Sequence, residues 1–221
     1  MATNPVAVLF GSFSLLIFAQ LMGALAGEVT VSGASETSQL FIIMGVSVIT
    51  LGVCISILLQ LTGYNWCSIG IRKPKRGWLK LLVISAVAYL VLSSALIALA
   101  TMFVSGFDVN QAQDIGISGA QSVGMMILGF LTLVVLTPIF EEILFRGLLF
   151  KGLRARLPFS MALLVSSGLF AAAHGQWNIA LDTFALGLIL GYLTEKTGSI
   201  IPAVILHAAK NSVAFVILFV L

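Results

Sequence analysis

The stretch GMMILGFLTLVVLTPIFEEILFRGLLF, residues 124–150, has the length and apolar character of a membrane-spanning helix, yet it carries three ionisable side chains. Moving one charged side chain to the centre of a bilayer costs about 2.5 to 3.5 kcal/mol on insertion scales. Glu141, Glu142 and Arg146 therefore need partners or a watery cavity. This requirement predicts a polar site inside a bundle of apolar helices.

The composition of the whole chain agrees with a membrane-embedded fold. Of the 221 residues, 60% are hydrophobic and 9% are charged, whereas charged residues make up about 25% of ordinary soluble domains. We therefore expect an all-α fold, a polytopic transmembrane bundle that forms a single domain over residues 1–221, with about seven spans and eight at most. The apolar runs that predict these spans are residues 5–26, 39–62, 78–104, 121–150, 158–175, 179–195 and 200–220.

The positive charges predict the orientation of the helices. Lys and Arg gather in GIRKPKRGWLK (70–80), in KGLRARL (151–157) and at Lys196, whereas the alternate loops at 27–37 and 105–116 carry only acids. By the positive-inside rule, the basic loops of a multi-pass protein of the cell membrane face the cytoplasm. These loops lack a basic face with interleaved aromatic side chains, so nucleic acid is not an expected partner.

The three charges of the opening stretch divide into an ion pair and a free carboxylate. Residues four apart share a helix face, and Glu before Arg at this spacing is the favoured orientation, which pairs Glu142 with Arg146. Glu141 lies about 100° round the helix from Glu142 and has no intrahelical partner. A carboxylate removed from water suits a general base. Pro138 lacks a backbone N–H and is expected to kink the helix beside the carboxylates.

Both histidines of the chain fall in late apolar runs. FAAAH places Phe170 and His174 on one helix face, and HAAKN places His207 and Asn211 on one face. Glu, His and Asn side chains without a Ser or Cys nucleophile fit hydrolysis by an activated water, in which a base takes the proton and neutral donors hold the oxyanion. Zinc held by two His and a carboxylate is the competing interpretation, although the HExxH pattern is absent.

Other late residues have simpler interpretations. Asp182 follows GQWN (175–178) and is expected as a charge near a helix N-terminus, with a supporting role in the site as the alternative. Lys210 flanks Asn211, and because its long stem can reach the interface no role is assigned to it. Gly187 and Gly191 form a GxxxG pattern that allows close packing of helices.

The ordered motifs resemble a known family. EEILFR (141–146), FAAAH (170–174) and HAAKN (207–211) match the EExxxR, FxxxH and HxxxN motifs of the CAAX protease and bacteriocin-processing family, also called the abortive-infection family. These are membrane glutamate endopeptidases related to the Rce1-type CAAX prenyl proteases. The similarity extends over about residues 65–215 and predicts a catalytic core at about residues 121–215.

The resemblance implies a role for each residue. Glu141 and His174 would activate the attacking water, His207 and Asn211 would stabilise the oxyanion, and the ion pair would support them without a cofactor. The partner would be a peptide or protein substrate, either a lipidated C-terminus, prenylated in the CAAX case, or a propeptide, reached from the cytoplasmic side. A proton-coupled transporter and a non-proteolytic binding or immunity protein are the alternatives, and no internal repeat supports the former.

Helix geometry leaves the depth of His174 unmatched. At 1.5 Å per residue, Glu141 lies about 15 Å above Lys151 and His207 about 10 Å above Ile200, but His174 lies about 24 Å beyond Pro158. The helix that carries His174 is therefore expected to begin below the interface, to tilt strongly or to end short of the outer surface.

Overall fold

The computed structural model describes residues 36–62, 65–107, 123–175 and 177–219, together with Gly11, Ser14 and Met22. Helices and the loops between them make up this part of the chain, without a strand, so the predicted all-α class is confirmed there. Five of the helices are uninterrupted: α2 (Glu36–Thr62), α3 (Trp78–Phe103), α7 (Phe159–Ala172), α8 (Trp177–Thr197) and α9 (Ile201–Phe219).

The number of membrane spans stays a prediction. Among the described residues, two helical segments, Trp78–Phe103 and Met126–Arg154, are long and apolar enough to cross a membrane. Shorter apolar stretches occur at Gly45–Ile57, Phe159–Ala172 and Ile201–Ile217. The first expected span, residues 5–26, lies outside the described residues except at three positions.

The helix that contains the opening stretch changes its hydrogen-bond register along its length. It consists in order of α4 (Val123–Phe130), the π-helix η1 (Leu131–Leu136), α5 (Thr137–Glu142), the π-helix η2 (Ile143–Phe150) and α6 (Lys151–Arg154). The first π-helical segment ends at Leu136, two residues before Pro138, which has no N–H to continue the ladder. π-helical insertions in α-helices are frequent at functional sites, and here they flank the two glutamates.

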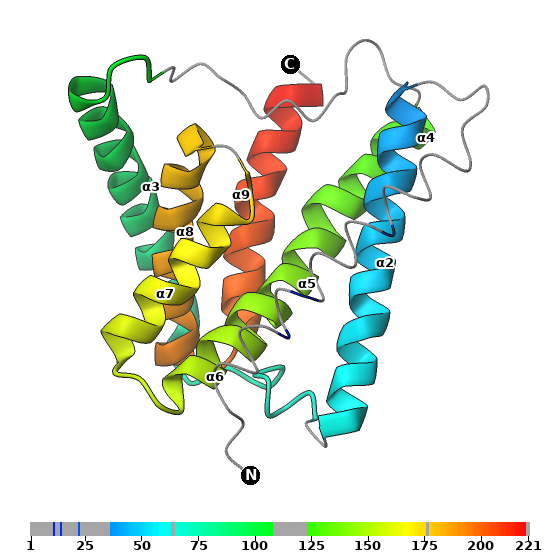
Figure 1. Ribbon diagram of the computed structural model, residues 1–221. Helices are drawn as coiled ribbons and strands as arrows, with labels where there is room; N and C mark the ends of the chain where they lie inside the picture. The colour runs from blue at the N-terminus through cyan, green and yellow to red at the C-terminus, as the bar shows by residue number, and fades with distance from the viewer. Residues whose placement is uncertain are drawn as a thin grey trace.

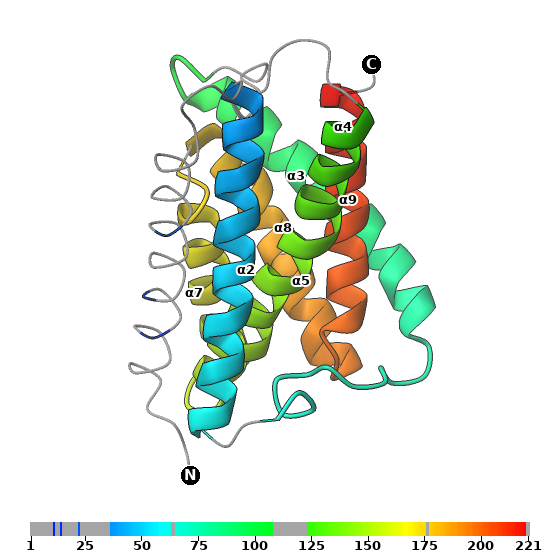
Figure 2. The ribbon, with the colours of Figure 1, turned by 90° about the vertical axis from the view of Figure 1, so that its right-hand side faces the viewer.

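Helix α8 lies at the centre of one half of the bundle and packs against α7, α3 and α9 (Figure 1). Gly187 and Gly191 allow this packing, because a Cβ on Gly187 would lie 2.9 Å from the Cβ of Ser167, and a Cβ on Gly191 would meet Leu163. The close packing predicted from the GxxxG pattern is thus confirmed. Helix α9 also packs against η1 and α5, and α2 runs alongside α4 and α5 (Figure 2).

The depth of His174 is explained by the course of α7. Figure 1 shows that α7 runs obliquely, and that the end of α7 and the start of α8 both lie below the upper ends of α3 and α9. A tilted helix gains less depth per residue than an upright one. Two of the three expected explanations, tilt and a helix end short of the outer surface, therefore apply together.

The loop before α3 braces the lower end of the bundle. The N–H of Lys75 donates to the carbonyl of Thr197 at 3.0 Å, and the N–H of Ile200 donates to the carbonyl of Gly70 at 3.0 Å. Lys151 Nζ donates to the carbonyl of Ser68 at 3.2 Å. These bonds place the start of α9 and the end of η2 at one level, which supports the comparison of depths along the two helices.

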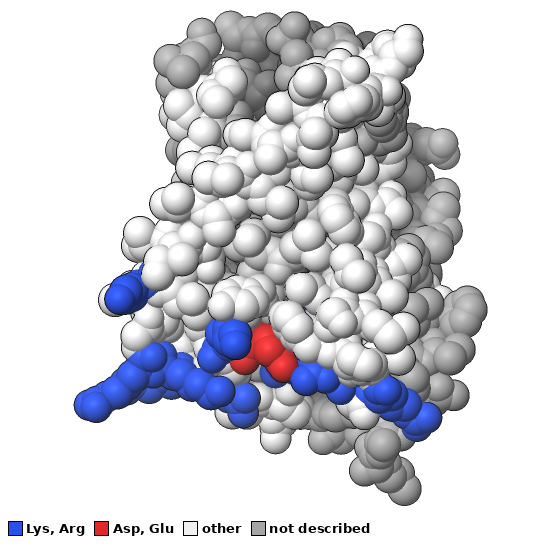
Figure 3. Space-filling model, turned by 90° about the vertical axis from the view of Figure 1, so that its left-hand side faces the viewer, with Lys and Arg blue, Asp and Glu red and all other residues white. Residues whose placement is uncertain are grey.

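Basic side chains gather at this braced end on the face that Figure 3 shows, with few acids among them. The exposed ones include Arg72, Lys73, Lys75 and Arg76 of the loop and Lys196 at the end of α8. The other surface in Figure 3 shows almost no charge. The protein thus has one basic end and an apolar flank.

Replacing Gly147 with Ala should destabilise the braced end. An added Cβ would lie 2.9 Å from the backbone oxygen of Ile69, so the loop or the helix must shift. Overpacking of this kind costs about 1 to 3 kcal/mol, more than the gain of roughly 1 kcal/mol in helix propensity. We expect Gly147→Ala to lower the Tm in detergent. The control is Gly168→Ala on α7, where a Cβ meets nothing within 4 Å. Equal Tm values for the two variants would contradict the brace.

Candidate active site

The predicted ion pair of the EEILFR motif is present and fully buried. Arg146 Nη1 donates to Glu142 Oε1 at 2.9 Å, and the two side chains are 2% and 0% exposed. The guanidinium also lies over the ring of Phe170, 4.3 Å from its centroid. Its second terminal nitrogen donates a longer bond of 3.4 Å to the carbonyl of Gly187. Arg146 is therefore engaged on several sides.

Glu142 has a second partner that the sequence did not predict. His207 Nδ1 lies 2.9 Å from Glu142 Oε1, the same oxygen that accepts from Arg146. An ionised carboxylate can only accept hydrogen bonds, so the Nδ1 atom carries the hydrogen. The other ring nitrogen, Nε2, is then directed at Glu141, with 3.6 Å between Nε2 and Glu141 Oε2. His207 therefore joins the two neighbouring carboxylates.

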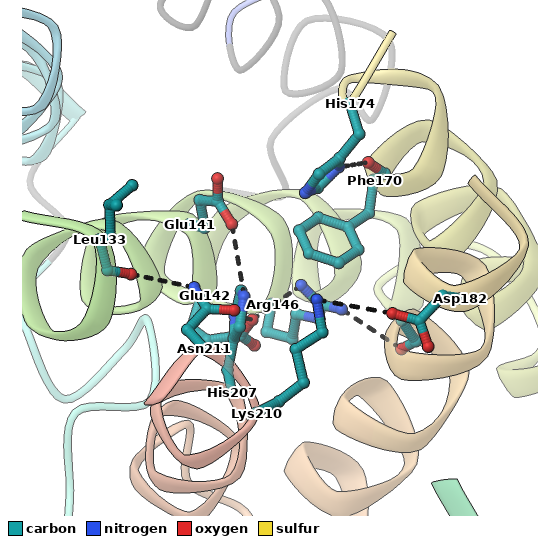
Figure 4. A network of polar contacts seen from close by, with 11 residues as sticks. Leu133, Glu141, Glu142, Arg146, Phe170, His174, Asp182, His207, Lys210 and Asn211 are labelled. Carbon is teal, nitrogen blue, oxygen red and sulfur yellow. Dashed lines mark hydrogen bonds and ion pairs between the residues drawn. The ribbon is translucent and has the colours of Figure 1, made fainter. Parts of the chain in front are cut away.

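The two carboxylates differ in access to water. The side chain of Glu141 is 20% exposed, whereas that of Glu142 is 0% exposed. Figure 4 shows Glu141 apart from the buried pair, with one of its oxygens directed at the His207 ring. Glu141 is thus the carboxylate that a water molecule can reach.

His174 belongs to the same cluster through Phe170. The His174 Nδ1 atom donates to the carbonyl of Phe170 at 2.8 Å, which leaves Nε2 free to accept in the neutral ring. The ring of Phe170 meets His174 and His207 edge to face, with centroids 4.9 and 5.7 Å apart. Within the described part of the chain, His174 and Glu141 are not hydrogen-bonded, although Figure 4 shows both on one side of the cluster. The sequence placed Phe170 and His174 on one helix face but did not predict that the ring of Phe170 separates the two histidines.

Asn211 donates to a backbone carbonyl of the η1 segment that has no donor within its own helix. In a helix the carbonyl of Leu133 would accept from residue 137 in α register or from residue 138 in π register. The N–H of Thr137 instead donates to Thr132, and residue 138 is proline. The Nδ2 atom of Asn211 donates to the carbonyl of Leu133 at 3.0 Å in their place. The amide keeps a second N–H for another acceptor.

The interpretations of Asp182 and Lys210 need correction. Asp182 is the sixth residue of α8 and lies outside its first turn, so it is not a helix N-terminal charge. It accepts from Tyr89 Oη at 2.7 Å and from Ser93 Oγ at 2.5 Å, both on α3. The Lys210 Nζ atom lies 3.5 Å from Asp182 Oδ2. Lys210 pairs inside the bundle because a carboxylate is within reach there, and it does not extend to the interface.

Metal ligation was the competing interpretation of the same residues. Over the ranges that the structure describes, no group of three or more His, Cys, Asp or Glu side chains is arranged to hold a metal ion. The nitrogens of His207 face Glu142 and Glu141.

The site lies in a segment with a recognisable family. The model of the type II CAAX prenyl endopeptidase Rce1-like family matches residues 122–213, from the start of α4 to the second half of α9. The chain contains an Rce1-like domain. All three motifs fall inside the matched range, so the predicted resemblance is confirmed. No curated protein and no solved structure matches the chain. Rce1-like proteins are membrane proteases that act on peptides or proteins, which agrees with the long apolar helices.

Removing one partner of the buried pair should unfold the Rce1-like domain more readily than removing both. Arg146→Met leaves Glu142 as an unpaired charge, and breaking a buried pair in this way costs about 3 to 5 kcal/mol. The double variant Arg146→Met with Glu142→Gln removes both charges and keeps an acceptor for His207. Its Tm in detergent should lie well above that of Arg146→Met. A double variant no more stable than the single one would argue against the buried pair.

The structural role of Asn211 can be separated from a chemical one. Asn211→Ala leaves the carbonyl of Leu133 without a donor, which costs about 1 to 3 kcal/mol. Adding Pro138→Ala supplies an N–H at residue 138, so the double variant should recover stability without regaining activity. If the double variant is no more stable than Asn211→Ala alone, Asn211 does not compensate for the missing N–H at residue 138.

Proposed function

We propose that the chain is an intramembrane endopeptidase of glutamate type, which cuts a peptide bond near the C-terminus of a lipidated, CAAX-like protein or within a propeptide. The observation that carries the proposal is the position of His207 between Glu142 and Glu141 in the Rce1-like domain, at 2.9 and 3.6 Å. The apolar helices that surround this group suit a substrate with a lipid or an apolar segment.

Glu141 is the general base in this mechanism. Its partial exposure lets water approach, and its carboxylate takes one proton from that water as the oxygen attacks the carbonyl carbon of the peptide. His174 orients the same water through Nε2, since its Nδ1 is fixed on Phe170. No step in this scheme is assigned to a metal.

His207 and Asn211 stabilise the tetrahedral intermediate. Asn211 donates its second amide N–H to the oxyanion. His207 can donate from Nε2 only when that nitrogen also carries a proton, because Nδ1–H is held by Glu142. The proton that Glu141 takes from water is the nearest supply. When the C–N bond breaks, this proton passes to the leaving amine, which restores the starting state.

The surroundings support a multi-pass protein in the cell membrane. The outward side of α3 exposes Leu79, Val83, Val87, Leu90 and Val91, as a lipid-facing helix would. We assign the basic end in Figure 3 to the cytoplasmic side by the positive-inside rule. Substrates then reach the site from the cytoplasm.

The first test is cleavage of a farnesylated CAAX reporter peptide by the purified protein in detergent. Glu141→Gln should lower kcat about 10² to 10⁴-fold, because it removes the general base. The control is Glu195→Gln, since Glu195 pairs with Arg154 at the basic end, away from the site. Its kcat should match the wild type.

Other results of this assay would favour one of the alternative functions or mechanisms. Wild-type turnover by Glu141→Gln would contradict the base role, and loss of activity with a strong chelator would favour zinc. If the reporter is not cleaved but an unprenylated propeptide is, the prenyl group is not required. If neither is cleaved, the transporter and binding-protein alternatives gain support.

A further inference from the structure

Lys210 is a cation in the middle of an apolar helix. It lies nine residues after Ile201, or about 14 Å along α9. Glu141 precedes Lys151 by ten residues, and the loop before α3 hydrogen-bonds to both Lys151 and Ile200. Figure 4 shows Lys210 in the same polar cluster as Glu141, the proposed general base. A lysine at such a depth costs about 2.5 to 3.5 kcal/mol on insertion scales and is by default a functional candidate.

The ammonium group of Lys210 is neutralised but not hydrogen-bonded. It lies 3.5 Å from Asp182 Oδ2, which makes an ion pair. In the ranges that the structure describes, Lys210 donates no hydrogen bond, although an ammonium has three N–H donors. Asp182 is held on its other oxygen by Tyr89 and Ser93. Asp182 would keep these two hydroxyl donors if the ammonium turned toward another anion.

The two cations of the site differ in their capacity to bind a ligand. Arg146 is 2% exposed and is engaged by Glu142, by Gly187 and by the ring of Phe170. The side chain of Lys210 is 25% exposed. An incoming anion can therefore be met by Lys210 but not by Arg146.

Lys210 also lies beside the proposed oxyanion donors. It follows His207 by three residues and precedes Asn211 directly, so all three lie on one side of α9. Figure 4 shows the ammonium between Arg146 and Asp182, on the α8 side of the cluster, with Glu141 on the opposite side. Three residues of extended peptide span about 10 Å. A chain end a few residues beyond the cut bond can thus reach α8.

We propose that Lys210 binds the free C-terminal carboxylate of the substrate peptide. A carboxylate accepts charge-assisted hydrogen bonds from an ammonium, and these are stronger than neutral ones. The site then cuts close to a chain end and disfavours bonds inside a propeptide. This inference rests on the proposed protease function and narrows its substrate class to peptides with a free C-terminus.

The test compares two reporter peptides that are identical except for the C-terminus, one a carboxylate and the other a carboxamide. With the wild-type protein, kcat/KM for the carboxamide should be at least tenfold lower, mostly through KM. Lys210→Met together with Asp182→Asn removes both charges, so no unpaired carboxylate destabilises the fold. The ratio of the two kcat/KM values should fall to about one in this variant. The control Lys196→Met changes an exposed lysine at the basic end and should keep the wild-type ratio.

The assay distinguishes a failure of the Lys210 inference from a failure of the proposed protease function. Equal cleavage of both peptides by the wild type would overturn the inference and leave the protease function intact. So would a carboxylate preference that persists in the Lys210→Met, Asp182→Asn variant. If neither this pair nor an unprenylated propeptide is cleaved, the protease function fails, and the inference fails with it.

Discussion

A single oxygen atom of a buried carboxylate organises the polar centre of this bundle. Glu142 Oε1 accepts from Arg146 and from His207, both at 2.9 Å. The first bond compensates the charge that burial would otherwise make costly. The second fixes which nitrogen of His207 carries hydrogen and so aims the other at Glu141. The Glu142–Arg146 ion pair, to which the family resemblance gives a supporting role, therefore includes the carboxylate that orients His207.

The backbone of the same helix contributes through its irregularity. A regular α-helix through residues 131–142 would bond the carbonyl of Leu133 within the helix and leave Asn211 without that acceptor. The π-helical segment and Pro138 together free this carbonyl, and α9 docks on it through Asn211. The helix with both glutamates and the helix with His207 are thus joined at the side chains and at the backbone. Such double attachment holds a polar site in register inside an apolar bundle.

Sequence reasoning succeeded where the interaction was local. The Glu142–Arg146 pair, the separate direction of Glu141 and the close packing at Gly187 follow from helical spacing alone. The bond from Glu142 to His207 joins residues 65 positions apart and depends on how α9 packs, which no spacing rule encodes. The hydroxyls that hold Asp182 come from α3, a helix that the sequence analysis did not connect with the site. The polar residues Tyr89 and Ser93 in the apolar run were the sequence signal that this helix has a polar partner.

The central claim, that Glu142 sets the proton position on His207, can be measured directly. The chain has two histidines, so ¹⁵N-labelled histidine gives two imidazole spin systems, and His174→Gln assigns them. We predict that His207 carries its hydrogen on Nδ1, with a strongly deshielded proton that loses this shift in Glu142→Gln. A neutral His207 ring protonated on Nε2, or a spectrum that Glu142→Gln does not change, would contradict the account.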